Sequence, residues 1–106
     1  MKIILGGAVV AFSLVLSGAA LAADMPKEGK ARCGVCHAID KKLVGPAWME
    51  VSKKYKGDAA AASKIAANVT KGGAFGWKLG TMPPKGAGAT DAEIKQLSEF
   101  IAGLAN

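Results

Sequence analysis

The feature that most constrains this chain is the segment CGVCH at residues 33–37, which contains both cysteines and the only histidine of its 106 residues. On one turn of helix, Cys33 and Cys36 are three residues apart, and His37 lies four residues after Cys33. Residues at these spacings are neighbours on a helix surface, so the three side chains share one face. The chemistry of these residues is therefore local to one turn, and the rest of the chain has to fold around it.

Four kinds of chemistry use such a face. A thioredoxin-type C-x-x-C pair belongs in a βαβ setting, and no strand pattern is visible here. A structural zinc ion needs four ligands, and the chain has no further Cys or His to supply the fourth. A disulfide across two intervening residues closes too small a loop to stabilise much. The remaining interpretation is covalent haem attachment, for which C-x-x-C-H is the pattern: each thiol adds to one vinyl group, and the histidine reaches the iron.

The first 23 residues have the pattern of a secretory signal peptide. Lys2 supplies a positive start, residues 3–16 are apolar, and residues 20–22 (ALA) form a small-residue cleavage site. A retained membrane anchor is the alternative, but the apolar run is short and interrupted by glycine and serine. We therefore expect a cleaved signal peptide at 1–23, a periplasmic protein without a stable membrane anchor, and one domain at 24–106.

That domain is small and poor in aromatic residues, with five of the six in the chain. A chain of about 80 residues buries only about 60% of its unfolded surface and is marginal without a staple, metal or cofactor. A large apolar cofactor would supply the missing core. Without the basic residue of the signal peptide, 13 basic and 8 acidic residues remain, a net charge of about +5. The charges are scattered, and together with export this disfavours nucleic-acid binding.

Residue patterns predict a small all-α fold of about four helices. The first helix is expected from near residues 24–26 into the cysteines, and the second over 48–55. The third is expected over 58–71, where Asp58 is a cap for an alanine-rich run with Ala62, Ile65 and Val69 on one face.

The last helix, at 90–104, has the clearest pattern. Thr90 and Glu93 form a capping box, and one apolar stripe follows it, made of Ile94, Leu97, Ile101 and Leu104. Residues 74–89 contain two prolines and four glycines, which predicts a loop.

A six-coordinate iron would need a second ligand besides His37. Met25 is too close to the cysteine turn to reach the opposite side, and Met49 lies in a predicted helix at ordinary core spacing. Met82 lies in the irregular segment GTMPPK, 45 residues after His37, where two prolines fix the backbone. Met82 is therefore the favoured candidate, and a gap-filling loop methionine is its alternative role.

Four segments taken in order resemble the class I c-type cytochromes, of the small bacterial kind called c-551 or c-552. They are CGVCH, LVGPAW, KGGAFGW, and TMPP before a final amphipathic helix. The resemblance covers essentially all of 24–106. It implies a small cytochrome c fold, with four or so helices around one haem c bound through Cys33 and Cys36, and with His37 and Met82 as iron ligands.

The resemblance also implies roles for residues around the ligands. Pro46 matches the proline whose carbonyl accepts the Nδ1 proton of the iron-bound histidine, and Trp77 matches the tryptophan that reaches a haem propionate. Small residues at Gly29 and Ala31 are expected to let the last helix cross closely, near Phe100. One departure is Lys85, which follows TMPP where asparagine is common in the family, so a contact near the methionine sulfur is in doubt.

These expectations together indicate electron transfer rather than enzymatic catalysis. Histidine and methionine ligation raises a haem reduction potential, and two filled axial positions leave no place for a substrate. Expected partners are other redox proteins with acidic docking patches, attracted by lysines near the haem edge, although a merely solubilising surface is equally consistent. The alternative function is a haem-based ligand-binding or peroxidase-like protein with a displaceable Met82.

Overall fold

The computed structural model describes residues 24–106, so the predicted signal peptide lies outside the described residues. These residues contain four α-helices, which are α2 (Lys27–Arg32), α3 (Trp48–Lys54), α4 (Ala61–Lys71) and α5 (Asp91–Gly103). Within 24–106 there is no β-strand, only two isolated bridges, so the all-α prediction is confirmed. None of the helices in that range has the length and apolar character needed to cross a bilayer.

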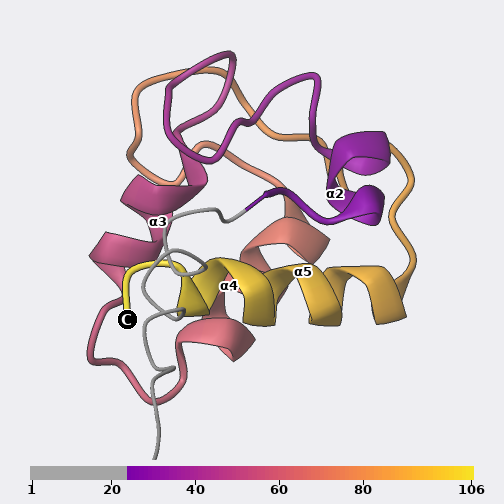
Figure 1. The fold of residues 1–106 in the computed structure, drawn as a ribbon. Helices are drawn as coiled ribbons and strands as arrows, with labels where there is room; N and C mark the ends of the chain where they lie inside the picture. The colour runs from indigo at the N-terminus through magenta and orange to yellow at the C-terminus, as the bar shows by residue number, and fades with distance from the viewer. Residues whose placement is uncertain (1–23) are drawn as a thin grey trace, which may run out of the picture.

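Helix α5 forms the base of the fold and contacts α2, α3 and α4 (Figure 1). It begins with the predicted capping box: the Thr90 hydroxyl accepts a hydrogen bond of 3.1 Å from the Glu93 amide, and the Glu93 carboxylate accepts one of 2.9 Å from the Thr90 amide. The first three residues of the predicted stripe are buried, whereas the fourth follows the helix and is half-buried. The core joins this stripe to α3 and α4 through Trp48, Ile65, Leu97 and Ile101.

Helix α4 begins three residues later than the sequence predicted, because Asp58 caps a turn that precedes the helix. Its carboxylate accepts a 2.8 Å hydrogen bond from the Ala60 amide and forms a 2.6 Å ion pair with Lys64. The residue at the helix N-cap is Ala60, which has no side-chain cap. Asp58 therefore orders the approach to α4 rather than its first turn.

Helix α2 crosses α5 closely at Gly29, which is buried. A methyl group at this position would lie 2.9 Å from the Trp48 ring and 3.2 Å from the Leu97 side chain, so a larger residue would separate the helices. The expected close crossing is thus present at Gly29, but it is made against Leu97. Ala31 is exposed, so its expected part in the crossing is wrong.

The end of the chain is tied to α3 by one buried hydroxyl. Ser52 is 1% exposed, donates a 3.3 Å hydrogen bond to the Ala102 carbonyl and accepts one of 2.9 Å from the Ala105 amide. A serine in the middle of α3 thus satisfies backbone groups at the carboxyl end of α5 that have no partner within their own helix. This contact fixes the position of α5 under the rest of the fold.

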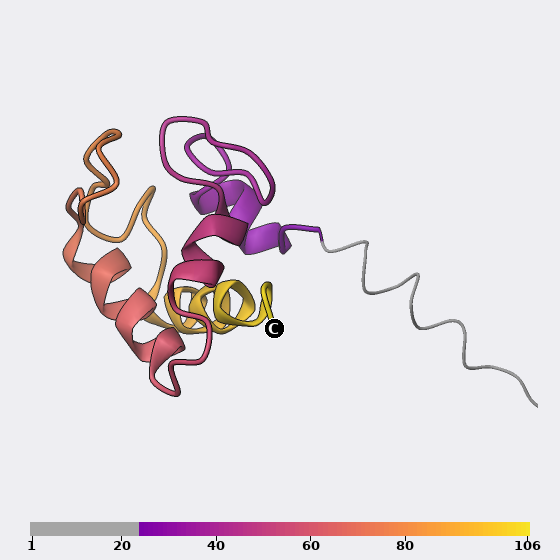
Figure 2. The same cartoon turned by 90° about the vertical axis from the view of Figure 1, so that its left-hand side faces the viewer.

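Two long non-helical segments lie above this helical base, residues 33–47 after α2 and residues 72–90 before α5. Figure 2 shows them on opposite sides of the molecule, the first in purple and magenta and the second in orange. The first carries the CGVCH turn, and the second carries the predicted loop with Met82. The fold therefore places these two sequence features so that they face each other above α5.

Candidate haem site

The cysteine turn continues directly from α2. The Cys33 amide bonds to the Gly29 carbonyl at 2.7 Å, and the Cys36 and His37 amides bond to the Cys33 carbonyl at 3.0 and 2.9 Å. Helical turn geometry therefore brings the two sulfurs and the imidazole to one side, as the spacing predicted. Both cysteines are half-buried, and they are not joined by a disulfide.

Burial raises the pKa of the Cys33 thiol, and the nearby Cys36 and Glu93 raise it further. At neutral pH the residue is therefore a thiol rather than a thiolate. Zinc and most catalytic cysteine chemistry use the thiolate, so this environment does not favour them.

The His37 ring is held in one orientation by the backbone carbonyl of Pro46. Its Nδ1 lies 2.8 Å from the Pro46 carbonyl oxygen, which can only accept, so Nδ1 carries the proton. The lone pair of the imidazole is therefore on Nε2, the nitrogen left available to bind a metal. Such a hydrogen bond from the distant ring nitrogen fixes the tautomer and makes the imidazole a stronger donor.

Gly45 makes this arrangement sterically possible. A methyl group there would lie 2.9 Å from both ring nitrogens of His37 and closer still to the carbon between them. The backbone of Gly45 is held on both sides, because its amide bonds to the Cys36 carbonyl at 2.7 Å and its carbonyl accepts from Leu43 at 3.1 Å. The histidine ring thus packs directly on a glycine whose backbone is held by two hydrogen bonds.

Met82 is held on the other long segment by a reciprocal pair of backbone hydrogen bonds. Its amide and carbonyl bond to the carbonyl and amide of Gly73, each at 2.9 Å. The neighbouring Gly72 has a φ of +76°, and a methyl group on it would lie 2.7 Å from the Met82 carbonyl. Glycines at 72 and 73 therefore allow the loop to lie tightly against the end of α4, which fixes the backbone of Met82.

Trp77 lies in the same loop and is half-buried. The ammonium group of Lys54 lies 5.1 Å from the centre of its ring, within the range of a cation–π contact. A positive charge therefore lies over one face of the Trp77 ring.

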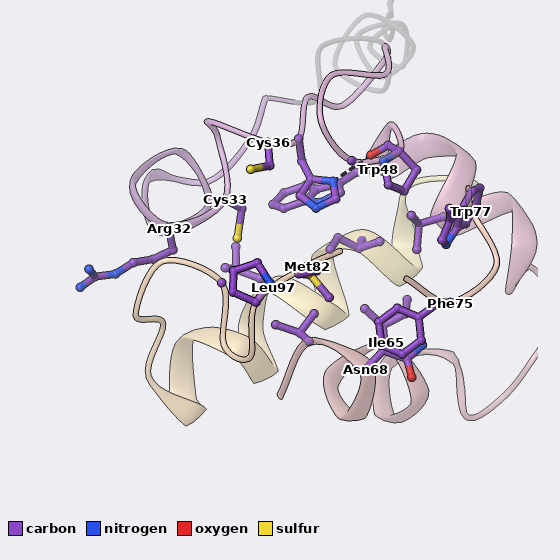
Figure 3. Close-up of a pocket in the computed structure, with 18 of the residues that line it drawn as sticks. Arg32, Cys33, Cys36, Trp48, Ile65, Asn68, Phe75, Trp77, Met82 and Leu97 are labelled. Carbon is purple, nitrogen blue, oxygen red and sulfur yellow. Dashed lines mark hydrogen bonds between the residues drawn. The ribbon is translucent and has the colours of Figure 1, made fainter. Parts of the chain in front are cut away.

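The predicted site residues converge on one cavity of about 360 Å³ between the two segments (Figure 3). Its lining is mostly apolar and includes every predicted site residue: Cys33, Cys36, His37, Pro46, Trp77 and Met82. Small-molecule and cofactor sites typically have volumes of about 300–1,000 Å³. Two thiols, one imidazole with a free Nε2 and one thioether around an apolar space fit a covalently bound haem.

Polar residues of the cavity wall that the sequence alone did not point to include Tyr55, Asn68 and Ser98. The Asn68 side-chain amide donates a 3.1 Å hydrogen bond to the Tyr55 hydroxyl, which joins α4 to the residue that follows α3, two segments that sequence alone does not place side by side. For Ser98 a signal existed, because it lies four residues after Ile94 and one after Leu97, within the buried stripe of α5.

A small helical fold that surrounds an apolar cavity with this set of side chains is that of a haem protein of the c type. The family model for cytochrome c matches residues 17–105, so the chain belongs to the cytochrome c family. The resemblance to class I c-type cytochromes is thereby confirmed, and with it a covalently attached haem c, with Cys33 and Cys36 spaced as in its attachment motif.

Individual relatives agree with this assignment. The chain is 39% identical to cytochrome c-551 of Allochromatium vinosum over 95 residues, which is 90% of this chain and all of that protein. It is 46% identical to cytochrome c-551 of Azotobacter vinelandii over 65% of this chain and 82% of that one. Among solved structures, wild-type cytochrome c552 of Nitrosomonas europaea matches with a TM-score of 0.66 and 32% identity, over 73% of this chain and 95% of that chain. These relatives support a role in electron transport.

Proposed function

We propose that this protein is a periplasmic carrier of single electrons whose haem iron is bound by His37 on one side and Met82 on the other. The observation that carries the proposal is that both side chains line one cavity, each from a backbone segment held by hydrogen bonds. The signal-peptide pattern of residues 1–23 supports export, with the mature domain at 24–106.

Bound haem supplies a one-electron couple between ferrous and ferric iron. The residues around it tune and protect that couple. The Pro46 carbonyl orients the imidazole of His37, and the thioether of Met82, a soft donor, favours ferrous iron and raises the potential. With His37 and Met82 both bound to the iron, no open position would be left for oxygen or a substrate. Trp77, half-buried at the cavity edge, is proposed to donate its indole N–H to a haem propionate.

The proposed partners are redox proteins with acidic docking patches. Lysines are exposed on both segments that border the cavity, among them Lys41, Lys42 and Lys78. Surface charge of one sign raises association rates with partners of the other sign, and salt screens the effect. We therefore expect association with the native partner to slow as ionic strength rises; a rate independent of salt would remove this part of the proposal.

The test of the ligand set is a Met82→Ala variant of the holoprotein, with Met49→Leu as its control. Met49 is a half-buried methionine of α3 that is not among the residues lining the cavity. Met82→Ala should abolish the far-red sulfur-to-iron charge-transfer band of the oxidised protein and lower the potential, while Met49→Leu should retain both. A Met82→Ala protein with an unchanged band would refute the assignment of Met82 as an iron ligand, and the alternative of a ligand-binding haem protein would then be tested.

A further inference from the structure

Among residues 24–106, Ser98 is the one fully buried polar residue of the cavity wall. Its exposure is 0%, it lies in the middle of α5, and its hydroxyl oxygen has no hydrogen-bond partner among residues 24–106. Neighbours on the same helix face are apolar, namely Ile94, Leu97 and Ile101.

Two other hydroxyls on the helices of residues 24–106 do find partners. Ser52, equally buried, bonds to two backbone groups, and Thr70 donates back to the carbonyl four residues earlier in its own helix at 2.8 Å. The same back-bond is sterically available to a serine within a helix. Ser98 does not make it, although a buried hydroxyl without a partner costs free energy. A purely structural role therefore does not explain the hydroxyl.

We propose, on the basis of the haem ligation proposed above, that Ser98 sets the reduction potential of the protein. A hydroxyl that no hydrogen bond holds can rotate, and in a cavity of low dielectric its dipole interacts strongly with charge. Oxidation adds one positive charge within this cavity, and the Ser98 hydroxyl can turn its oxygen toward that charge. Ser98 thus stabilises the oxidised form relative to the reduced form and lowers the potential.

The experiment is a redox titration of the wild-type holoprotein and of four variants. Ser98→Ala and Ser98→Val remove the hydroxyl, Ser98→Thr keeps it, and Ser63→Ala removes an exposed hydroxyl of α4 as the control. Thr and Val have nearly the same volume, so their comparison isolates the hydroxyl from the added bulk. Alanine is a better helix former than serine, so Ser98→Ala should fold.

We expect a higher potential in Ser98→Ala than in the wild type, a higher potential in Ser98→Val than in Ser98→Thr, and no shift in Ser63→Ala. Denaturant unfolding of both oxidation states gives an independent readout: Ser98→Ala should stabilise the reduced form more than the oxidised form. A potential that is unchanged or lower in Ser98→Ala, or equal in the Thr and Val variants, would overturn the proposal. If instead the wild type lacked the far-red band, the proposed ligation itself would have failed, which is a different outcome.

Discussion

Replacing Gly45 with alanine tests how tightly the protein holds its histidine. The new methyl group would lie 2.9 Å from both nitrogens of the His37 ring and closer still to the carbon between them, whereas ordinary van der Waals contact begins at 3.4 Å, so the ring would have to move by more than 0.5 Å. The φ of Gly45 lies outside the positive range that disfavours other residues, so alanine suits its backbone and the effect is steric. The expected result is a displaced ring and a weakened hydrogen bond to Pro46.

The size of the effect follows from three contributions. Overpacking a filled site costs about 1–3 kcal/mol, and the lost hydrogen bond costs about 0.5–1.5 kcal/mol. Replacing glycine with alanine lowers the entropy of the unfolded chain and returns about 0.4–1 kcal/mol. The net loss is therefore about 2 kcal/mol, which for a domain of this size lowers Tm by roughly 8–16 °C.

The assay is thermal and denaturant unfolding of the holoprotein, with Gly103→Ala as the matched control. Nothing lies within 4 Å of a methyl group at Gly103, at the end of α5, so this variant should be neutral or more stable by up to about 1 kcal/mol. A weaker His37–Pro46 bond should also make the imidazole a poorer donor and raise the potential. A Gly45→Ala protein as stable as Gly103→Ala, with an unchanged potential, would show that the ring is not held as described.

Three further variants test other contacts. Ser52→Ala should lower the unfolding free energy by about 1–3 kcal/mol, because it leaves the half-buried Ala105 amide without its partner; the same loss from Ser63→Ala would contradict this. Lys85 has a φ of +62°, a conformation that asparagine tolerates better than lysine, so Lys85→Asn should raise the unfolding free energy by up to about 1 kcal/mol. A lower unfolding free energy would show that the backbone at position 85 is not strained. The Thr90 amide and then Arg32 lower the pKa of Glu93, so its contribution is present at neutral pH and lost as pH falls through the folded pKa. Glu93→Gln should therefore be less stable than wild type at pH 7, and the difference in stability should shrink in acid. A difference that did not change with pH would show that the charge of Glu93 does not contribute to stability.

Much of the fold could be predicted because it depends on local chemistry. The capping box of α5 needs only Thr90 and Glu93 three residues apart, and the turn at 33–37 needs only helical spacing to bring two sulfurs and an imidazole together. Prolines and glycines marked residues 74–89 as a loop, and the structure has no helix there. These features are encoded within a few residues of one another.

The rest depended on contacts between distant segments. Asp58 could cap either the helix or the turn before it. In the structure Asp58 caps the turn, and it also forms an ion pair with Lys64. The need for glycine at position 45 follows from the ring of His37, which only the folded loop brings against it. The Asn68–Tyr55 bond joins α4 to the residue that follows α3, so no pattern within either segment reveals it. The assignment of Met82, Pro46 and Trp77 to roles around the iron stays a prediction.

The most direct test of the central claim is proton NMR of the reduced, diamagnetic holoprotein. Residues 24–106 contain three methionines, Met25, Met49 and Met82, and a methyl group directly above a tetrapyrrole is shifted far upfield by its ring current. We expect one methionine methyl at such a position, absent in Met82→Ala, and two in the ordinary range. Three methyl signals in the ordinary range would contradict the proposal that His37 and Met82 bind the iron from opposite sides.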